Sequence, residues 1–160
     1  MKIKEFKAIL EKKRADFALF CNSDSSRYNA NMLYFSGYKG LGALVVPKNK
    51  LAFLVAPDME IKRARRSMVK KAYSMEKKRF FESIYKIIKK NKIKSGNIAI
   101  DKNNFTLNSY KHFKKQFKRI KARDISSDCM KLRKIKTEKE LQLLKKSCKY
   151  ADKILQKTIK

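Results

Sequence analysis

Hydrophobic and polar residues follow one another along the chain with two different spacings. Helical spacing occurs in residues 3–14, 80–88 and 107–117, and it predicts amphipathic helices there. Short apolar runs at 17–21 and 97–101 predict buried strands. Because helices and strands alternate, the sequence predicts an α/β fold with a central sheet flanked by helices.

The first half of the chain also contains the pattern of a β-hairpin. Two apolar runs, at 43–46 and 51–55, flank the polar turn 47–50. A further short strand is predicted at 122–126. Since a hairpin pairs its strands antiparallel, the predicted sheet is mixed rather than purely parallel.

Capping residues predict two further helices. Asp58 follows Pro57, and its side-chain oxygen is expected to cap a helix over about 59–69. Thr137 and Glu140 have the spacing of a capping box, which predicts a helix from there to the end of the chain. The hydrophobic stripe of this C-terminal helix comprises Leu141, Leu144, Cys148, Ala151 and Leu155. Such a stripe needs a surface to cover it.

The composition indicates a folded domain with a large excess of positive charge. The 160 residues include 43 Lys and Arg against 14 Asp and Glu, a net charge of +29, and 43% of them are hydrophobic. This is enough apolar material for the core of one domain with an added element. The charged N-terminal stretch does not fit a signal peptide, and no run approaches the roughly 18 apolar residues of a membrane span.

The cysteines predict neither a disulfide framework nor a zinc site. Cys21, Cys129 and Cys148 are odd in number and widely spaced, so a reducing cytoplasm is the expected compartment. Cys21 follows an apolar run and Cys148 lies on the helical stripe, and both are expected to be small core residues. Cys129 lies in a polar connection without the surroundings of a nucleophile.

The other candidate catalytic residues favour structural roles. His112, the single histidine, lies in a Lys-rich helical segment and is expected to be a solvated surface residue. Asp101 and Asp124 lie near strand ends and are expected to act in turns and caps. The sequence therefore predicts no catalytic residue and no metal ligand within this chain.

Residues 31–38, with the sequence Asn-Met-Leu-Tyr-Phe-Ser-Gly-Tyr, predict a compact turn. Asn31 is expected to bond its own nearby backbone. Gly37 lies between a helical turn and a strand, where a positive φ is expected. Tyr34 is expected to bury apolar area against the sheet. The first interpretation of the motif is that it packs this turn.

This segment resembles a motif of the N-terminal domain of the creatinase/prolidase family, the Xaa-Pro peptidases. The family motif is Asn-x-x-Tyr-Leu-Thr-Gly-Phe, and Asn31, Tyr34 and Gly37 match it outright. The resemblance supports a second, functional interpretation of the segment. In this interpretation Tyr38 and Lys39 belong to a substrate-access loop that approaches the pocket of the partner subunit.

A second resemblance lies near the end of the chain. Residues 132–141 are similar to the family's joint, Arg-x-Ile-Lys-Ser/Thr-x-x-Glu-Ile/Leu, with Arg133, Lys136 and Glu140 in matching positions. The joint implies that residues 1–129 are the N-terminal domain. Residues 130–160 would then be the joint and the first helix of a catalytic domain that is missing here.

The resemblance also implies an activity for the parent protein. Family members bind two divalent metal ions, Mn, Co or Zn, through two Asp, one His and two Glu of the catalytic domain, and release a residue before proline or cleave an Xaa-Pro dipeptide. The expected role of this chain is non-catalytic: it contributes to a homodimer and to active-site access for a peptide substrate. The chain is either a truncated piece, which the C-terminal helix favours, or a free-standing relative without the catalytic half.

The charge leaves an alternative function open. An excess of +29 attracts polyanions, and it allows a basic nucleic-acid-binding or protein-binding module derived from a peptidase-like domain. The excess is mostly Lys and is spread along the chain, which indicates non-specific polyanion binding rather than base reading. An AT-rich genome or adaptation to salt would produce the same composition.

Overall fold

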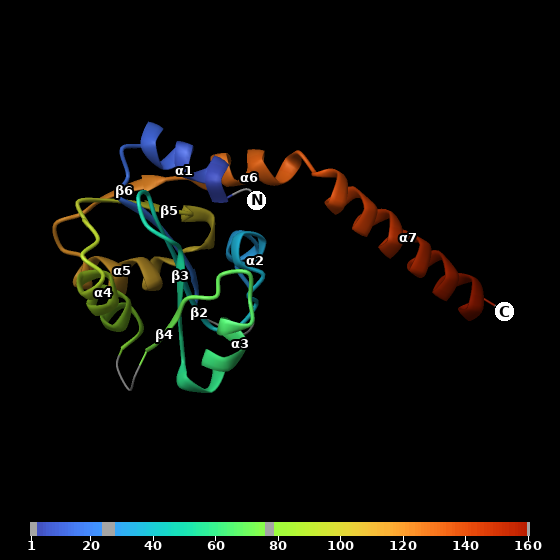
Figure 1. Cartoon of the computed structure of the whole chain (residues 1–160), viewed down its shortest axis with the longest axis horizontal. Helices are drawn as coiled ribbons and strands as arrows, with labels where there is room; N and C mark the ends of the chain where they lie inside the picture. The colour runs from blue at the N-terminus through green and yellow to red at the C-terminus, as the bar shows by residue number, and fades with distance from the viewer. Residues whose placement is uncertain (1–2, 24–27, 76–78, 160) are drawn as a thin grey trace. The chain divides into compact units, whose positions relative to one another are not determined.

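The computed structural model describes residues 3–23, 28–75 and 79–159, and the chain divides into two compact units, Met1–Cys129 and Met130–Lys160 (Figure 1). The elements follow in the order α1 (Ile3–Lys12), β1 (Phe17–Asn22), α2 (Ala30–Ser36), β2 (Gly42–Pro47), β3 (Phe53–Ala56), η1 (Asp58–Glu60), α3 (Ile61–Arg65), β4 (Ala72–Ser74), α4 (Phe80–Lys90), β5 (Asn97–Ile100), η2 (Lys102–Asn104), α5 (Leu107–Gln116), β6 (Lys121–Asp124), α6 (Ser126–Lys134) and α7 (Glu138–Thr158).

The first unit is built on one mixed sheet, as predicted. Its six described strands lie in the order β4-β3-β2-β1-β5-β6. The β1–β2 and β2–β3 pairs are antiparallel, and the β3–β4, β1–β5 and β5–β6 pairs are parallel. In register, Leu19 of β1 lies opposite Val45 of β2 on one side and Ile100 of β5 on the other. The predicted hairpin is therefore confirmed as β2–β3, and the fold is α/β.

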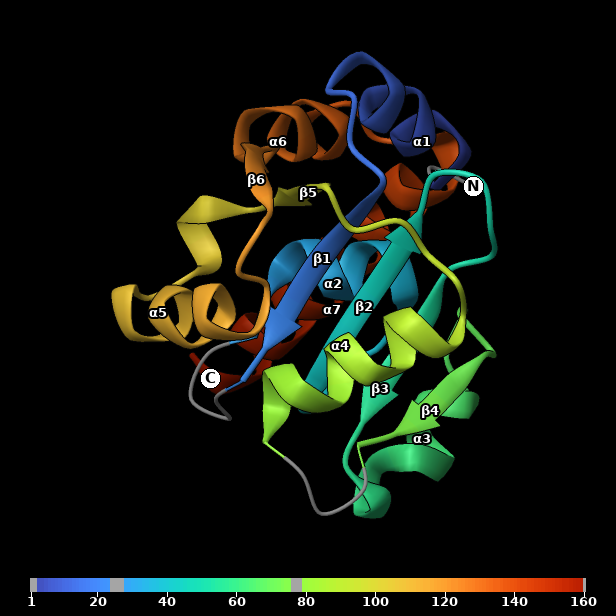
Figure 2. The same ribbon diagram turned by 90° about the vertical axis from the view of Figure 1, so that its left-hand side faces the viewer.

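Helices cover both faces of the sheet, with α4 and α2 on opposite faces (Figure 2). On the face under α4 and α5, Leu19 belongs to a buried cluster that contains Ile84 of α4 and Phe113 of α5. On the other face, the Phe20 ring lies 5.6 Å from the Phe6 ring of α1, measured between centroids. All six residues of β1 are buried, which explains why its sequence is a continuous apolar run rather than an alternating one.

The segment after β3 differs from its prediction. Instead of one helix over 59–69, the chain forms the short turns of η1 and α3 and then the edge strand β4, which the sequence pattern did not predict. Asp58 does not cap this helix; its carboxylate accepts a hydrogen bond from Ser74 Oγ of β4. After α3, the amide N of Met68 donates to Ser36 O at 2.9 Å, so a long-range contact ends the helix early.

The start of α6 explains the role of Asp124. Its Oδ1 accepts hydrogen bonds from the amide N of Ser126 at 3.0 Å and from Ser126 Oγ at 2.6 Å. Burial acts to raise the pKa of Asp124, but these bonds, together with Lys102, outweigh it and hold the pKa below its usual value. Asp124 thus acts in the turn that leads into α6, as expected. Cys129 is buried within α6, a helix that the sequence did not predict.

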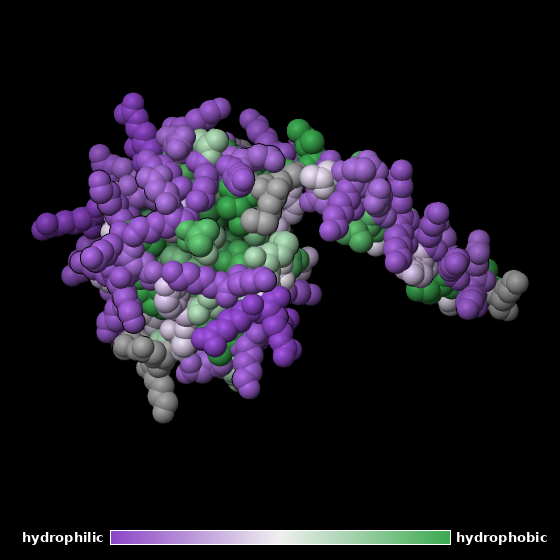
Figure 3. Space-filling view, viewed as in Figure 1, coloured by the Kyte–Doolittle hydropathy of each residue, from purple (hydrophilic) through white to green (hydrophobic). Residues whose placement is uncertain are grey.

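In the second unit, the predicted capping box begins α7. Thr137 N donates to Glu140 Oε2 at 2.7 Å, and Glu140 N donates to Thr137 Oγ1 at 3.3 Å. No described residue of α7 is buried, and hydrophobic side chains lie among hydrophilic ones along it (Figure 3). Cys148 is exposed, so the prediction that it is a core residue is wrong.

Among the described residues, no helix combines the length and apolar character that crossing a membrane requires.

Candidate functional site: the loop after α2

The helix that precedes the candidate loop has a defined start and end. At its start, Asn29 Oδ1 accepts hydrogen bonds from the amide N atoms of Asn31 and Met32, both at 3.0 Å. At its end, Gly37 has φ 67° and donates its N–H to Leu33 O at 2.7 Å. The positive φ predicted for Gly37 is confirmed, because the chain leaves α2 through a left-handed residue.

Asn31 makes a long-range contact that its position in the motif did not predict. Its Nδ2 donates to Oδ2 of Asp101, which is 70 residues away at the end of β5. Asn104 Nδ2 donates to the same oxygen at 2.6 Å, and Asp101 is 1% exposed. Asn29 already caps α2, so the Asn31 side chain is available to tie the helix to the sheet. Asp101 is thus a buried junction residue as well as the residue that precedes η2.

Tyr38 holds the loop from the inside. Its side chain is 2% exposed, and its hydroxyl lies 2.8 Å from Leu41 O and 3.0 Å from Glu60 Oε2. Burial, followed by the hydrogen bond and charge of Glu60, raises the pKa of Tyr38, so the phenol stays protonated and remains a donor. Tyr38 is thus buried and hydrogen-bonded, and it fixes the position of the loop from inside.

Two further residues, which the sequence pattern did not single out, clamp the loop from either side. Asn22, the last residue of β1, donates from Nδ2 to the carbonyl oxygens of Lys39 at 3.1 Å and Gly40 at 2.9 Å. On the other side, a Cβ added to Gly40 would lie 2.3 Å from Glu60 Oε2. A side chain at position 40 would therefore force Glu60 or Tyr38 to shift. No local pattern marks these two residues. Asn22 lies 17 and 18 positions from the carbonyls it bonds, and Glu60 lies 22 positions from Tyr38.

Lys39 is the exposed side chain of the predicted pair. Its Nζ lies 5.1 Å from the centroid of the Tyr28 ring, within the range of a cation–π contact. Beside the loop, Met68 approaches Gly37 and is 55% exposed, and Met59, next to Glu60, is 87% exposed. The outer surface of the loop region therefore offers the charge of Lys39 and two adaptable apolar side chains, which suits binding.

The three residues of the second motif organise the connection between α6 and α7. Glu140 belongs to the capping box described above. Lys136 Nζ donates to the carbonyl oxygen of Arg133 at 2.6 Å, near the end of α6. The Lys136 ammonium therefore bonds a carbonyl oxygen before the turn, and the Glu140 carboxylate bonds an amide N–H after it.

Tyr34, from the first motif, packs edge to face against the neighbouring Phe35 ring, with 5.3 Å between the ring centroids.

The residues present do not fit a dinuclear metal centre. In the part of the chain that the structure describes, no three His, Cys, Asp or Glu side chains gather into a possible metal site. His112 is exposed on α5, as predicted, and the side-chain amides of Asn31 and Asn104 both donate to Oδ2 of Asp101.

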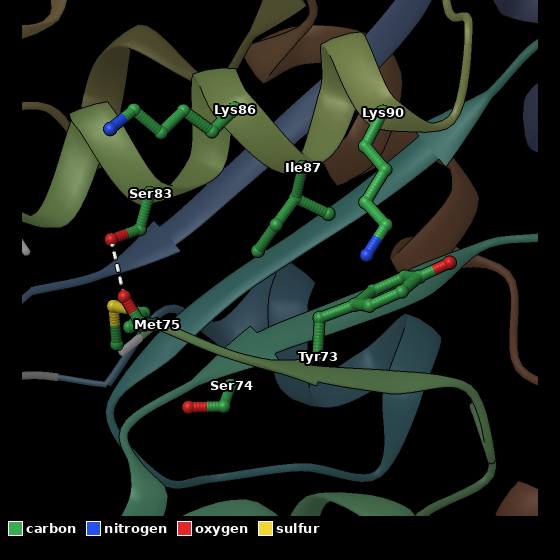
Figure 4. A pocket seen from close by; sticks show the side chains of 7 residues that line it. All are labelled: Tyr73, Ser74, Met75, Ser83, Lys86, Ile87 and Lys90. Atoms are coloured by element: carbon green, nitrogen blue, oxygen red, sulfur yellow. Dashed lines mark hydrogen bonds between the residues drawn. The ribbon is translucent and has the colours of Figure 1, made fainter. Parts of the chain in front are cut away.

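A hollow of about 190 Å³ between β4 and α4 also lacks catalytic groups (Figure 4). Ser83 Oγ donates to Met75 O at 2.7 Å, the bond drawn in Figure 4. Tyr73 donates its hydroxyl to Asn91 Oδ1 at 2.7 Å, and Lys86 pairs with Glu82 at 3.0 Å. These polar side chains already have structural partners, so this hollow is not the candidate site.

The sequence profile of the creatinase/prolidase N-terminal domain matches residues 2–135 of the chain. The chain therefore belongs to the creatinase/prolidase N-terminal domain family, as the two motifs predicted.

Individual relatives agree with this assignment. An uncharacterised peptidase of Staphylococcus epidermidis is 27% identical over 97% of this chain, which spans 42% of that relative. An X-Pro aminopeptidase of Thermotoga maritima has the same fold with a TM-score of 0.80 at 20% identity, over 91% of this chain and 40% of that chain. A proline dipeptidase of Streptococcus pneumoniae matches with a TM-score of 0.70 at 18% identity, over 84% of this chain and 98% of that chain.

The junction between α2 and β5 yields a prediction about stability. Asn31→Ala leaves the buried carboxylate of Asp101 with one fewer donor, so we expect the free energy of unfolding to fall by about 2–3 kcal/mol. Asn103→Ala, at an exposed position nearby, is the matched control and should change it by less than about 0.5 kcal/mol. The measurement is urea denaturation followed by circular dichroism. Equal effects of the two substitutions would show that the junction contributes nothing.

The close approach at Gly40 yields a second prediction. Gly40→Ala places a methyl group against Glu60 and Tyr38, so we expect a loss of about 1–3 kcal/mol in the free energy of unfolding. Gly96→Ala is the control, because its added Cβ would meet Asp16 Oδ2 at an ordinary 3.6 Å. That variant should be neutral or slightly stabilising. A Gly40→Ala protein as stable as the Gly96→Ala protein would contradict a clamped loop.

Proposed function

We propose that this chain forms the N-terminal, non-catalytic part of an Xaa-Pro metallopeptidase, where it contributes to a homodimer and shapes access to the active site. The observation that carries the proposal is the loop of residues 38–42, which is held rigidly from inside by Tyr38 and by Asn22 while Lys39 stays exposed. A rigid loop is suited to a fixed position at the mouth of a pocket, since little conformational freedom is lost when it binds.

In this proposal the loop lies beside the peptidase pocket of the partner subunit. Met59 and Met68 supply apolar area for the subunit contact, and their side chains are exposed in this chain. Lys39 presents a positive charge that attracts the carboxylate of a short peptide substrate. The loop acts by position and charge, and the groups that break the peptide bond belong to another domain.

The second unit supplies the connection to that domain. We assign residues 130–160 as the joint and the first helix of a catalytic domain, whose surface covers the exposed side chains of Leu144 and Leu155 on α7. That domain would carry two Asp, one His and two Glu as ligands for two Mn, Co or Zn ions. When bound, such a metal pair supplies an activated water for hydrolysis of the bond next to proline. We expect the whole protein to be cytoplasmic.

The division of roles predicts that residues 1–160 alone are inert. The purified chain should release no amino acid from Xaa-Pro dipeptides or from peptides with proline in the second position, with Mn²⁺, Co²⁺ or Zn²⁺ present, because the described residues assemble no metal centre. Amine release measured by ninhydrin or mass spectrometry tests this. Metal-dependent turnover by the chain alone would refute the non-catalytic assignment.

The access role is tested in the protein that carries this chain together with its metal-binding domain. Lys39→Ala should raise KM for a short Xaa-Pro substrate about two- to fivefold and leave kcat unchanged, because an exposed charge contributes about 1 kcal/mol or less. Lys111→Ala, on exposed α5, is the charge-matched control and should change neither constant. Identical kinetics of the Lys39 and Lys111 variants would exclude Lys39 from substrate access.

A further inference from the structure

Two adjoining hollows lie where the β2–β3 turn meets the connection between α4 and β5. They measure about 410 and about 270 Å³ and share Asn49, Lys50 and Ile93 in their linings. Figure 2 shows this turn near α1 and beside the chain that leaves α4. The lysines that line the two hollows come from separate segments: Lys7, Lys48, Lys50, Lys71, Lys92 and Lys94.

Two of these lysines, Lys7 and Lys50, already bond backbone carbonyl oxygens and so have structural roles. Lys50 Nζ donates to Asn91 O at 2.6 Å and to Lys92 O at 3.2 Å, so it caps the C-terminal end of α4. Lys7 Nζ donates to the carbonyl oxygen of Lys50 at 2.8 Å. The positions of both ammonium groups are therefore set by backbone carbonyls and not by carboxylates.

The remaining positive charge has little acidic compensation. Within the described ranges, none of the six lysines forms an ion pair, and Lys71 lies over the Tyr73 ring at 5.4 Å. The one carboxylate in the linings is that of Asp16, whose Oδ2 accepts from the amide N atoms of Gly96 and Asn97, each at 2.9 Å. The other three lysines, Lys48, Lys92 and Lys94, make no described side-chain hydrogen bond or ion pair, so their charges are available to an anionic ligand.

We propose that these two hollows bind the phosphodiester backbone of duplex nucleic acid without reading its sequence. The lining residues described here include no arginine, so the bidentate fork that reads guanine is absent. Phe53, the one aromatic residue among them, is 1% exposed and offers no ring for an unpaired base to stack on. Lysine ammonium groups act as point charges, which suits regularly spaced phosphates.

The test compares two triple variants of the 160-residue chain that remove the same charge. The first replaces Lys48, Lys92 and Lys94 by Gln, and these lysines make no described side-chain hydrogen bond. The control replaces Lys111, Lys115 and Lys118, which are exposed on or just after α5, by Gln. Binding to a fluorescein-labelled 20-base-pair DNA duplex is measured by anisotropy from about 0.02 to 0.2 M NaCl, a range over which phosphate contacts weaken strongly.

We expect the first variant to lose about tenfold or more in affinity at about 0.1 M NaCl, and its salt slope to fall by about three, one for each phosphate contact removed. The control should keep the slope of the unsubstituted chain, and a second duplex of unrelated sequence should bind equally well. Thermal unfolding must show that both variants remain folded; if the first is unfolded, Lys48→Gln and Lys94→Gln are measured singly, each with an expected slope change of about one.

Three results would overturn the proposal. Equal losses in the two triple variants would show that net charge alone drives binding. An unlabelled polyglutamate that displaces the duplex at the same charge concentration would indicate an acidic protein partner instead. Absence of binding at about 0.02 M NaCl would show that the hollows hold no polyanion, since phosphate contacts are strongest at low salt.

Discussion

The structure depends on strand β1, which is buried on both faces and paired on both edges. It pairs antiparallel with β2 on one edge and parallel with β5 on the other, so the direction of pairing changes along it. Packing from α1 and α2 on one face and from α4 and α5 on the other removes all six of its residues from water. Its last residue, Asn22, then bonds the loop after α2. The burial that stabilises the core therefore also fixes the position of the candidate site.

The fold was largely predictable because its core elements follow simple periodicities. The apolar run of β1, the hairpin and the stripe of α4 were found directly, since each buries side chains at a regular spacing. The prediction failed where a long-range contact decides the local structure. The helix expected over 59–69 is cut short by the bond from Met68 N to Ser36 O, and the edge strand β4 is three residues long, too short to show a period.

The candidate site was predictable in part, from a family motif and not from the periodicity of hydrophobic residues. The family motif identified Asn31 and Gly37 as positions of special geometry, but not the partner of Asn31. Asp101 lies 70 residues further along the chain, and no local pattern relates the two. The same applies to Glu60, whose oxygen approaches Gly40 so closely that an added side chain would force Glu60 or Tyr38 to shift. A motif therefore indicates which positions make special contacts, but only the fold shows which distant residues they contact.

The fold determines where the lysine charges lie, which the composition alone does not show. A chain with +29 net charge repels itself, and folding brings its lysines closer together. Part of this cost is offset where ammonium groups bond carbonyl oxygens at helix ends, as Lys50 does at α4 and Lys136 does at α6. Such bonds fix the positions of lysines without neutralising them. Where several of them surround one hollow, the fold holds positive charge in place before any ligand arrives, so an anion that binds there loses less free energy to ordering of the site.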